Sequence, residues 1–285
     1  MIRSLTVIGH GTNLLPHFVE HYSKYVDEIQ LVVYETNDNP NLGKEVYELT
    51  EEYNNVKIVK VIKDRIYDWN KVTALYNLYK SKQPNDWWII ADIDEFHLYP
   101  YDNLQLLIDD CELNAWDIVR GGFIDRVGRG GEFPTIESDK SIWEQFPNAG
   151  FFRYPMSNAC PNKICLVRGY VKITSGQHYA EFDGQTTWKW QGWNHPLIAP
   201  YHDYSIQVHH FKWDSTVIER IKSVALIKQD YSYSDEYEKM FKSLLKSKFK
   251  INLIDDEFMF ELGLIQPEYN GYRNWKKLFN KIVTI

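Results

Sequence analysis

Four short apolar runs alternate with helical segments in the first third of the chain, and this alternation constrains the fold more than any other feature. The runs are residues 5–11, 28–35, 56–62 and 86–96, and the segments between them, 14–26, 44–54 and 69–82, show helical patterns. We expect Asn13 to cap the first helix. Strands separated by helices of this length form right-handed βαβ units. The pattern predicts an α/β protein with a Rossmann-like, mostly parallel central sheet flanked by helices.

The rest of the chain is less regular. Further strands are predicted at residues 116–124, 163–174 and 205–213, with an aromatic loop at 176–200 and a charged helix pair at 215–248. No linker, repeat or low-complexity tract interrupts the sequence. We therefore expect one continuous domain with a C-terminal helical extension.

Charge and cysteine content limit the partners and the compartment. The net charge of −7, from 39 acidic and 32 basic residues, argues against a protein that neutralises nucleic-acid phosphates. No apolar run is long enough to span a membrane, and the first residues lack the features of a signal peptide. Three cysteines are too few for a disulfide framework. We expect a cytoplasmic protein without a transmembrane segment or a nucleic-acid partner.

The sequence Asp92-Ile93-Asp94-Glu95 directly follows the apolar run that ends at Ala91. Strand alternation would put Asp92 and Asp94 on one side and Glu95 on the other. Carboxylates at the end of a buried strand need neutralisation, and two hard oxygen donors suit Mg²⁺ or Mn²⁺, with phosphate oxygens completing the coordination. The alternative interpretation is helix capping together with ordinary solvation. We expect a metal site at Asp92 and Asp94.

Polar residues also follow the other predicted strands. They are His10 and Thr12, Glu35, and Lys63 and Asp64. Ligands of open parallel sheets bind beyond the carboxyl ends of the strands. The binding site is therefore expected at this edge of the sheet.

Four segments in order carry a resemblance to a known family. They are residues 13–38, the run WWIIADIDEFHLYP, the run FIDRVGRGGEFP with WEQFP at 143–147, and the late His210-Phe211-Lys212-Trp213 after GYVKITSGQH. The set resembles the nucleotide-sugar-dependent glycosyltransferases of the GT-A fold, in particular family-2-like enzymes, over residues 5–225. The sequence departs from that family in a short first loop and in lacking its Glu-Asp pair for the catalytic base.

The resemblance implies a transferase domain at residues 1–225 and a helical extension at 226–285 packed on the same domain. It implies a metal-dependent enzyme that moves a sugar from a UDP- or GDP-sugar donor to a glycan or other hydroxyl acceptor, with inversion, using Mn²⁺ or Mg²⁺. By analogy with the fold, the nucleoside would be bound by Thr12, Glu35 and Asp64. Arg65 and Lys71 would contact the phosphates, together with the metal on Asp92. The base of an inverting reaction would be Asp125, Glu181 or Asp183. A retaining mechanism is the alternative.

The tandem His209-His210 lies in a predicted strand, so only one of the two rings can face the site. His210 directly precedes the Phe-Lys-Trp of the resemblance, and we expect it to be a third metal ligand or to reach the diphosphate. An imidazole nitrogen beside two carboxylates would suit Mn²⁺ better than Mg²⁺. The alternative is a core histidine with a backbone partner.

Two other function classes remain open. A sugar-phosphate nucleotidyltransferase also uses an α/β sheet, paired Asp residues and a divalent ion, but its first loop is usually basic, unlike Gly9-His10-Gly11-Thr12. A non-catalytic carbohydrate-binding protein would be supported by the aromatic loop alone, which holds Trp188, Trp190 and Trp193.

Overall fold

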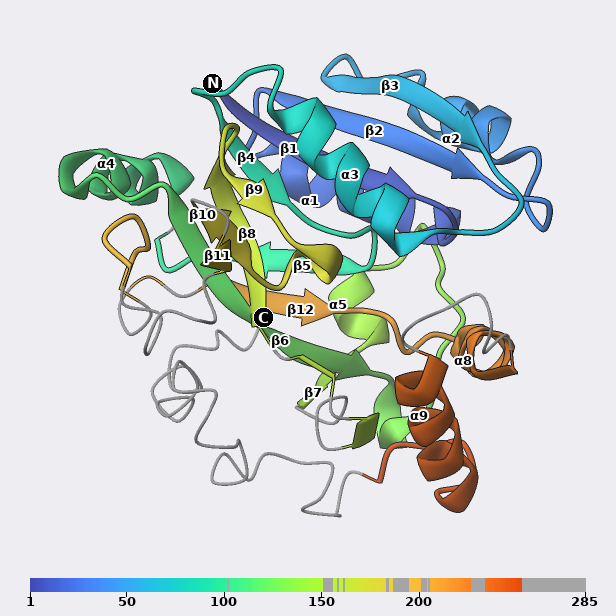
Figure 1. Cartoon of the computed structure of the whole chain (residues 1–285). Helices are drawn as coiled ribbons and strands as arrows, with labels where there is room; N and C mark the ends of the chain where they lie inside the picture. The colour runs from blue at the N-terminus through green and yellow to red at the C-terminus, as the bar shows by residue number, and fades with distance from the viewer. Residues whose placement is uncertain are drawn as a thin grey trace.

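One curled central sheet, flanked by helices, organises the computed structural model (Figure 1). The structure describes residues 1–101, 103–150, 156–157, 159–160, 162–182, 185–186, 195–200, 204, 206–226 and 234–252. The order of paired strands is β3-β2-β1-β4-β8-β6-β12-β5, and β7 pairs with β6. These strands are β1 Ile2–Ile8, β2 Glu28–Glu35, β3 Val56–Lys63, β4 Trp87–Ile90, β5 Glu95–Leu98, β6 Ile118–Val127, β7 Asn148–Gly150, β8 Asn162–Arg168 and β12 Ile206–His210.

The helices connect and cover this sheet. They are α1 Leu15–Ser23, α2 Leu42–Thr50, α3 Trp69–Lys80, α4 Leu104–Asn114, α5 Ile142–Gln145, α8 Val217–Leu226 and α9 Ser234–Lys246, with short 3₁₀ turns η1 Thr12–Leu14, η2 Arg129–Gly131 and η3 Ser175–Gln177. A second, small sheet contains β9 Lys172–Ile173, β10 Ala180–Phe182 and β11 Gln185–Thr186. The α/β prediction is confirmed, as are helices within each half of the predicted 215–248 pair.

The sheet is parallel in its first part and mixed in its second. β3, β2, β1 and β4 all pair in parallel, as the βαβ pattern predicts. β8 then pairs antiparallel with both β4 and β6, and β12 is parallel to β6 but antiparallel to β5. The sheet is thus parallel from β3 to β4 and mixed from β8 to β5.

Three details of the predicted elements are wrong. The predicted strand at residues 163–174 is two strands, β8 in the central sheet and β9 in the small sheet. Residues 86–96 do not form one strand: β4 ends at Ile90, and a turn in which the Glu95 amide donates to the Asp92 carbonyl (2.9 Å) leads into β5. Asn13 does not cap α1, because it lies inside η1 and the residue before the helix, Leu14, makes no capping side-chain bond. Pro16 in the first turn supplies the start signal instead.

Separate apolar clusters hold the layers together. α1, α2 and α4 pack in a cluster on one face of the sheet, and α3 packs with Trp88 and Ile90 in another. α8 and α9 form a third cluster with Val127 at the end of β6, Trp213 and Ile251. The third cluster brings the described part of the C-terminal extension to the carboxyl end of β6. Within the described ranges, no helix is both long and apolar enough to cross a membrane.

Candidate functional site

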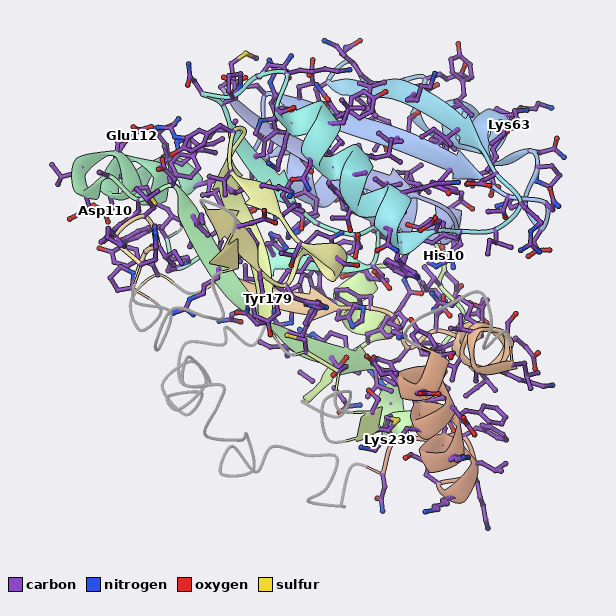
Figure 2. All side chains as sticks on the ribbon, viewed as in Figure 1. His10, Lys63, Asp110, Glu112, Tyr179 and Lys239 are labelled. Carbon is purple, nitrogen blue, oxygen red and sulfur yellow. The ribbon has the colours of Figure 1, made fainter. Side chains whose placement is uncertain are left out.

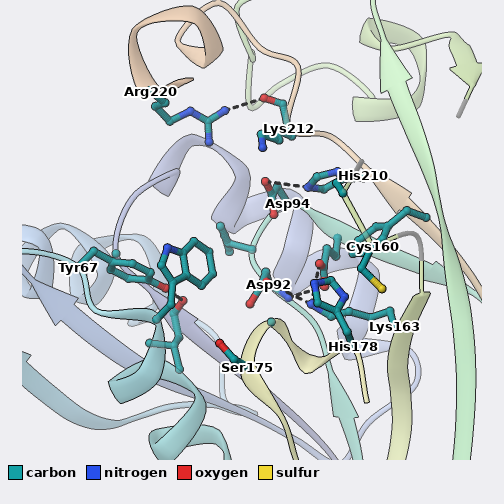
Figure 3. A pocket seen from close by; sticks show the side chains of 18 of the residues that line it. Tyr67, Asp92, Asp94, Cys160, Lys163, Ser175, His178, His210, Lys212 and Arg220 are labelled. Carbon is teal, nitrogen blue, oxygen red and sulfur yellow. Dashed lines mark hydrogen bonds and ion pairs between the residues drawn. The ribbon is translucent and has the colours of Figure 1, made fainter. Parts of the chain in front are cut away.

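A cavity of about 470 Å³ opens beyond the carboxyl ends of β1 and β4, a volume typical of small-molecule sites. Figure 3 shows side chains from distant parts of the chain meeting there: Tyr67 before α3, the Asp92–Glu95 turn, Lys163 on β8, and Arg220 on α8. Figure 2 places His10 between the end of β1 and the α8–α9 pair, while Lys63 lies at the outer edge of the sheet. The cavity lies where the sequence predicts a site.

Three carboxylates reach this cavity from one turn. Asp92 Oδ1 accepts a hydrogen bond from the Tyr76 hydroxyl (2.8 Å), and Asp94 Oδ2 lies 3.4 Å from His210 Nε2. Glu95 was expected on the opposite side, and this is wrong. Its Oε2 accepts from the Asp92 amide (2.9 Å), because the turn after Ile90 ends the strand alternation.

Lys163 neutralises two of these carboxylates from β8. Its ammonium lies 3.2 Å from Asp92 Oδ2 and 2.7 Å from Glu95 Oε1, and it donates to Gln177 Oε1 at 2.6 Å. Burial alone would lower the pKa of Lys163, but the charges of Asp92 and Glu95 raise it above its ordinary value. Lys163 is not among the residues nominated from the sequence, although a lysine at the start of an apolar strand is a visible signal.

His210 lies between two carboxylates. Its Nε2 is near Asp94, its Nδ1 is 3.3 Å from Asp125 Oδ1, and the Trp213 indole donates to the same Asp125 oxygen (3.0 Å). Burial would raise the pKa of Asp94, but the charges of His210, Arg220 and His10 hold it well below its ordinary value. Asp94 is therefore a carboxylate at neutral pH. Asp125 lies behind His210 and is almost fully buried.

The neighbouring histidine, His209, faces a different environment. Its Nδ1 accepts from Arg126 Nε (3.0 Å) and its Nε2 lies 3.1 Å from Gln207 Oε1. Both histidines are buried, so burial alone does not distinguish them. Their different partners do.

Cations and aromatic rings complete the cavity. Lys212 and Arg220 line it from the C-terminal side, with Arg220 held by the Lys212 carbonyl (2.6 Å) and by Asp214 (3.2 Å). On the other side Tyr67 and Trp69 lie edge to face, with ring centroids 5.1 Å apart. The cavity thus combines carboxylates, cations and half-buried aromatic rings. Of the residues that line it, Asp92, Asp94 and His210 were nominated from the sequence, and His10 was named among the polar residues that follow the strands.

The residues nominated for the nucleoside and phosphates lie outside the lining formed by the described residues. Glu35 accepts from the Gly43 amide (2.9 Å) and pairs with Lys63 (3.0 Å), and Thr12 donates to Glu45. Asp64 accepts hydrogen bonds from the Tyr34 hydroxyl (2.8 Å) and from the Arg65 amide (2.8 Å). It also forms an ion pair with the exposed Lys71, so the nominated Arg65 and Lys71 both contact Asp64.

The remaining base candidates are dispersed. Glu181 lies on β10 and pairs with Lys172 (3.1 Å), away from the cavity lining. Asp183 and the three tryptophans of the aromatic loop, Trp188, Trp190 and Trp193, lie outside the described residues.

The donor set suits a divalent ion that is shared with a ligand. In the described part of the chain no three His, Cys, Asp or Glu side chains are grouped to hold a metal by themselves. Asp92 and Asp94 still offer hard carboxylate oxygens to the cavity, and Mg²⁺ commonly binds through one or two carboxylates plus substrate phosphates. The residues present fit such an ion.

Comparison with known proteins adds little. No protein-family model and no curated protein matches the chain. Among solved structures it is similar to a protein assigned as a glucose-1-phosphate thymidylyltransferase from Bacillus anthracis, at 11% identity and a TM-score of 0.28, covering 50% of this chain and 63% of that one. It is also similar to a mannosyltransferase from Pyrobaculum calidifontis in complex with GDP-Man and Mn2+, at 11% identity and a TM-score of 0.34, covering 99% and 85%. Both names are those of transferases, but likeness at these TM-scores carries no argument about activity.

Proposed function

We propose that the protein is a metal-dependent glycosyltransferase of the GT-A type. It moves a sugar from a nucleotide-sugar donor to a glycan or other hydroxyl acceptor. The observation that carries the proposal is that Asp92 and Asp94 line the same cavity as the cations Lys212 and Arg220, beyond β1 and β4. Such a cavity can accept a divalent ion and a diphosphate together.

The two acidic residues have a clear task in this reaction. Asp92 and Asp94 would hold Mn²⁺ or Mg²⁺, which when bound supplies Lewis-acid stabilisation of the leaving diphosphate. Lys212 and Arg220 would add fixed positive charge toward the phosphate oxygens. Arg220 is suited to this role because two contacts already hold its guanidinium at the cavity wall.

His210 would complete the metal site. A ligating histidine usually donates its other ring N–H to a carboxylate, which fixes the tautomer. The distances from His210 to Asp94 and Asp125 fit that pattern, with Nδ1–H donating to Asp125 and Nε2 directed toward Asp94. Because Asp92, Asp94 and His210 are not grouped to hold a metal by themselves, His210 would join them only around an ion that the diphosphate also binds, or would reach the diphosphate directly. An imidazole ligand would favour Mn²⁺ over Mg²⁺.

The nucleoside has two candidate locations. Tyr67 and Trp69 offer rings inside the cavity, on which a base can stack. Thr12, Glu35 and Asp64, with Arg65 and Lys71, remain the candidates from the loops after the first three strands. For them to contact the nucleotide, it would have to extend beyond the cavity lining.

The base of an inverting reaction would be Asp125, Glu181 or Asp183. Among these, Asp125 is joined to the cavity through His210. An acceptor proton could reach Asp125 through the imidazole only if His210 Nε2 is not bound to the metal, so this role and the metal-ligand role of His210 are alternatives.

The first experiment measures donor turnover and binding. With a panel of UDP-, GDP- and dTDP-sugars and Mn²⁺, we expect donor hydrolysis or transfer that stops on chelation. Asp94→Asn should lower Mn²⁺-dependent donor affinity at least about tenfold, while Asp139→Asn, an exposed aspartate far from the cavity lining, should not.

The same panel separates the alternatives. Formation of a nucleotide-sugar from a sugar phosphate and a nucleoside triphosphate would identify a nucleotidyltransferase. Glycan binding with no effect of nucleotide or metal would identify a carbohydrate-binding protein. Either result would overturn the proposal.

A further inference from the structure

A thiol and an imidazole face the cavity opposite the aromatic rings. Cys160 and His178 both line it (Figure 3), and a hydrogen bond with His178 is among the causes that lower the pKa of Cys160. The Tyr179 hydroxyl lies 3.4 Å from Cys160 Sγ. The proposed glycosyl transfer gives this pair no role.

The imidazole is held in place from two sides. His178 Nδ1 lies 2.7 Å from the carbonyl oxygen of Asn162, so Nδ1 carries a proton and Nε2 is left for the thiol. Gly176 lies against the same ring, and a Cβ there would approach Nε2 to 2.6 Å. A nucleophile beside a base that a third group orients is the arrangement of an activated thiol.

The charges of the pair favour the thiolate. Burial alone would raise the pKa of Cys160, but the imidazolium of His178 and hydrogen bonds from His178 and Tyr179 lower it to about 7. Burial alone would lower the pKa of His178, but the Cys160 thiolate raises it. The other charged group that acts on His178 is Lys163, which opposes its protonation and is itself neutralised by Asp92 and Glu95.

The other two cysteines provide an internal contrast. Cys111 on α4 and Cys165 on β8 are fully buried, and neither lines the cavity. Burial raises the pKa of Cys111 to about 12 and that of Cys165 well above its ordinary value. Cys160 is partly exposed. A reagent in solution should therefore discriminate strongly among the three.

We propose that Cys160, activated by His178, is a reversible thiolation site for small disulfides, and that thiolation obstructs the cavity. The Cys160 thiolate attacks one sulfur of the disulfide, a new S–S bond forms to Cys160, and the S–S bond of the reagent breaks. Cys160 is oxidised, and the released half is reduced and leaves as a thiolate that takes up the proton from His178 or water. A reducing thiol reverses the step. The obstruction of donor binding, unlike the thiolation, rests on the proposed function.

The first experiment follows the intact mass of the full-length protein. Oxidised glutathione should add one glutathionyl group, on Cys160 only, and dithiothreitol should remove it. Cys160→Ser should take up none, and Cys165→Ser should behave as the unchanged protein. No adduct on the folded protein, or an adduct on Cys111 or Cys165, would overturn the proposal.

The second experiment measures the role of His178 with iodoacetamide. The rate of Cys160 alkylation should rise with pH through a midpoint near 7. In His178→Gln the midpoint should move to about 8.5, the value of an ordinary thiol. The rate at pH 7 should fall only about threefold, because the higher nucleophilicity of a more basic thiolate offsets part of the effect of the smaller thiolate fraction. A midpoint near 8.5 in the unchanged protein would refute activation even if His178→Gln failed to fold.

The third experiment keeps the two proposals apart. Mn²⁺ with UDP or GDP, whichever binds, should slow thiolation of Cys160, and the glutathionylated protein should lose at least about tenfold in nucleotide affinity. Thiolation that leaves nucleotide affinity unchanged would overturn the obstruction. If neither nucleotide binds the unmodified protein, the proposed function fails, and the mass and alkylation results still decide the thiolation.

Discussion

The ammonium of Lys163 lies 3.2 Å from Oδ2 of Asp92, although the two residues are 71 positions apart in the chain. Lys163 also pairs with Glu95 and is almost completely buried. The pairing of β4 with β8 brings these groups together. The acidic turn is thus neutralised in part by the protein itself, and the proposed metal would neutralise only the charge that remains.

Replacing Lys163 by Met should destabilise the protein by about 3–5 kcal/mol, because it leaves carboxylates without their buried counter-ion. Lys172→Met removes an exposed lysine from its pair with Glu181 and should cost less than about 1 kcal/mol. Urea unfolding at pH 7 measures both. Adding Glu95→Gln to Lys163→Met should recover part of the loss, and equal losses in the two single variants would contradict this assignment.

An ion pair of β1 should make the stability of the protein depend on pH in the acid range. Arg3 Nε lies 2.7 Å from Asp86 Oδ2, and Arg3 also pairs with Glu28. Burial would raise the pKa of Asp86, but the hydrogen bond from Arg3 and the positive N-terminus lower it. A carboxyl with a lowered folded pKa contributes stability above its unfolded pKa of about 3.9 and loses it as pH falls through the folded value.

Unfolding free energy should therefore decrease as pH falls below about 4. Arg3→Met should have lower stability at pH 7 and a shallower decrease toward pH 2.5. Urea titrations at pH 7, 5, 4, 3 and 2.5 test this. A decrease of the same steepness in both proteins would show that Arg3 does not set the acid response.

The fold was largely predictable because its first part is built from local patterns. Each of β1, β2 and β3 is an apolar run followed by a helix, and parallel pairing follows from that order. The mixed part was not predictable, because the pairing of β12 with both β5 and β6 depends on contacts between residues about a hundred positions apart. The turn at Asp92 was missed because the residues around it are apolar enough to continue a strand.

The site residues were predictable only where several functional side chains stand close together in the sequence. Asp92, Asp94 and His210 were nominated, and all three line the cavity. Lys163 and Arg220 are single basic residues without a motif, and only strand pairing and the docking of α8 bring them to the same place. Glu35 ends a strand as expected, but the Gly43 amide and Lys63 satisfy its carboxylate at the outer part of the sheet.

The aromatic wall gives a prediction about the nucleoside. Trp69→Ala should weaken the affinity for UDP or GDP about tenfold, because base–aromatic stacking contributes about 1–3 kcal/mol. Tyr47→Ala removes an exposed ring from α2, outside the cavity, and should change nothing. Calorimetry with Mn²⁺ present compares the two. Unchanged affinity in Trp69→Ala would leave Thr12, Glu35 and Asp64 as the nucleoside candidates.

The last prediction separates the two adjacent histidines by their partners. His209 accepts from Arg126 Nε at 3.0 Å, and burial together with the charge of Arg126 lowers the pKa of His209 well below its ordinary value. His209→Ala should cost about 1.5–3 kcal/mol of stability, since the hydrogen bond to a buried guanidinium is lost. It should leave Mn²⁺-dependent affinity for the diphosphate unchanged.

His210→Ala should have the opposite signature. Its ring lies 3.4 Å from Asp94 Oδ2 and 3.3 Å from Asp125 Oδ1, so it connects a candidate metal ligand to a buried carboxylate. Its removal should lower Mn²⁺-dependent diphosphate affinity at least about tenfold. Asp125→Asn alters the partner shared by His210 Nδ1 and the Trp213 indole, and it should have a smaller effect of the same sign. Calorimetric titrations of UDP and GDP with and without Mn²⁺, each paired with a urea unfolding curve, distinguish ligand loss from instability. If affinity fell in His209→Ala but not in His210→Ala, the metal-dependent affinity would depend on the histidine that does not line this cavity. That result would refute the assignment of His210.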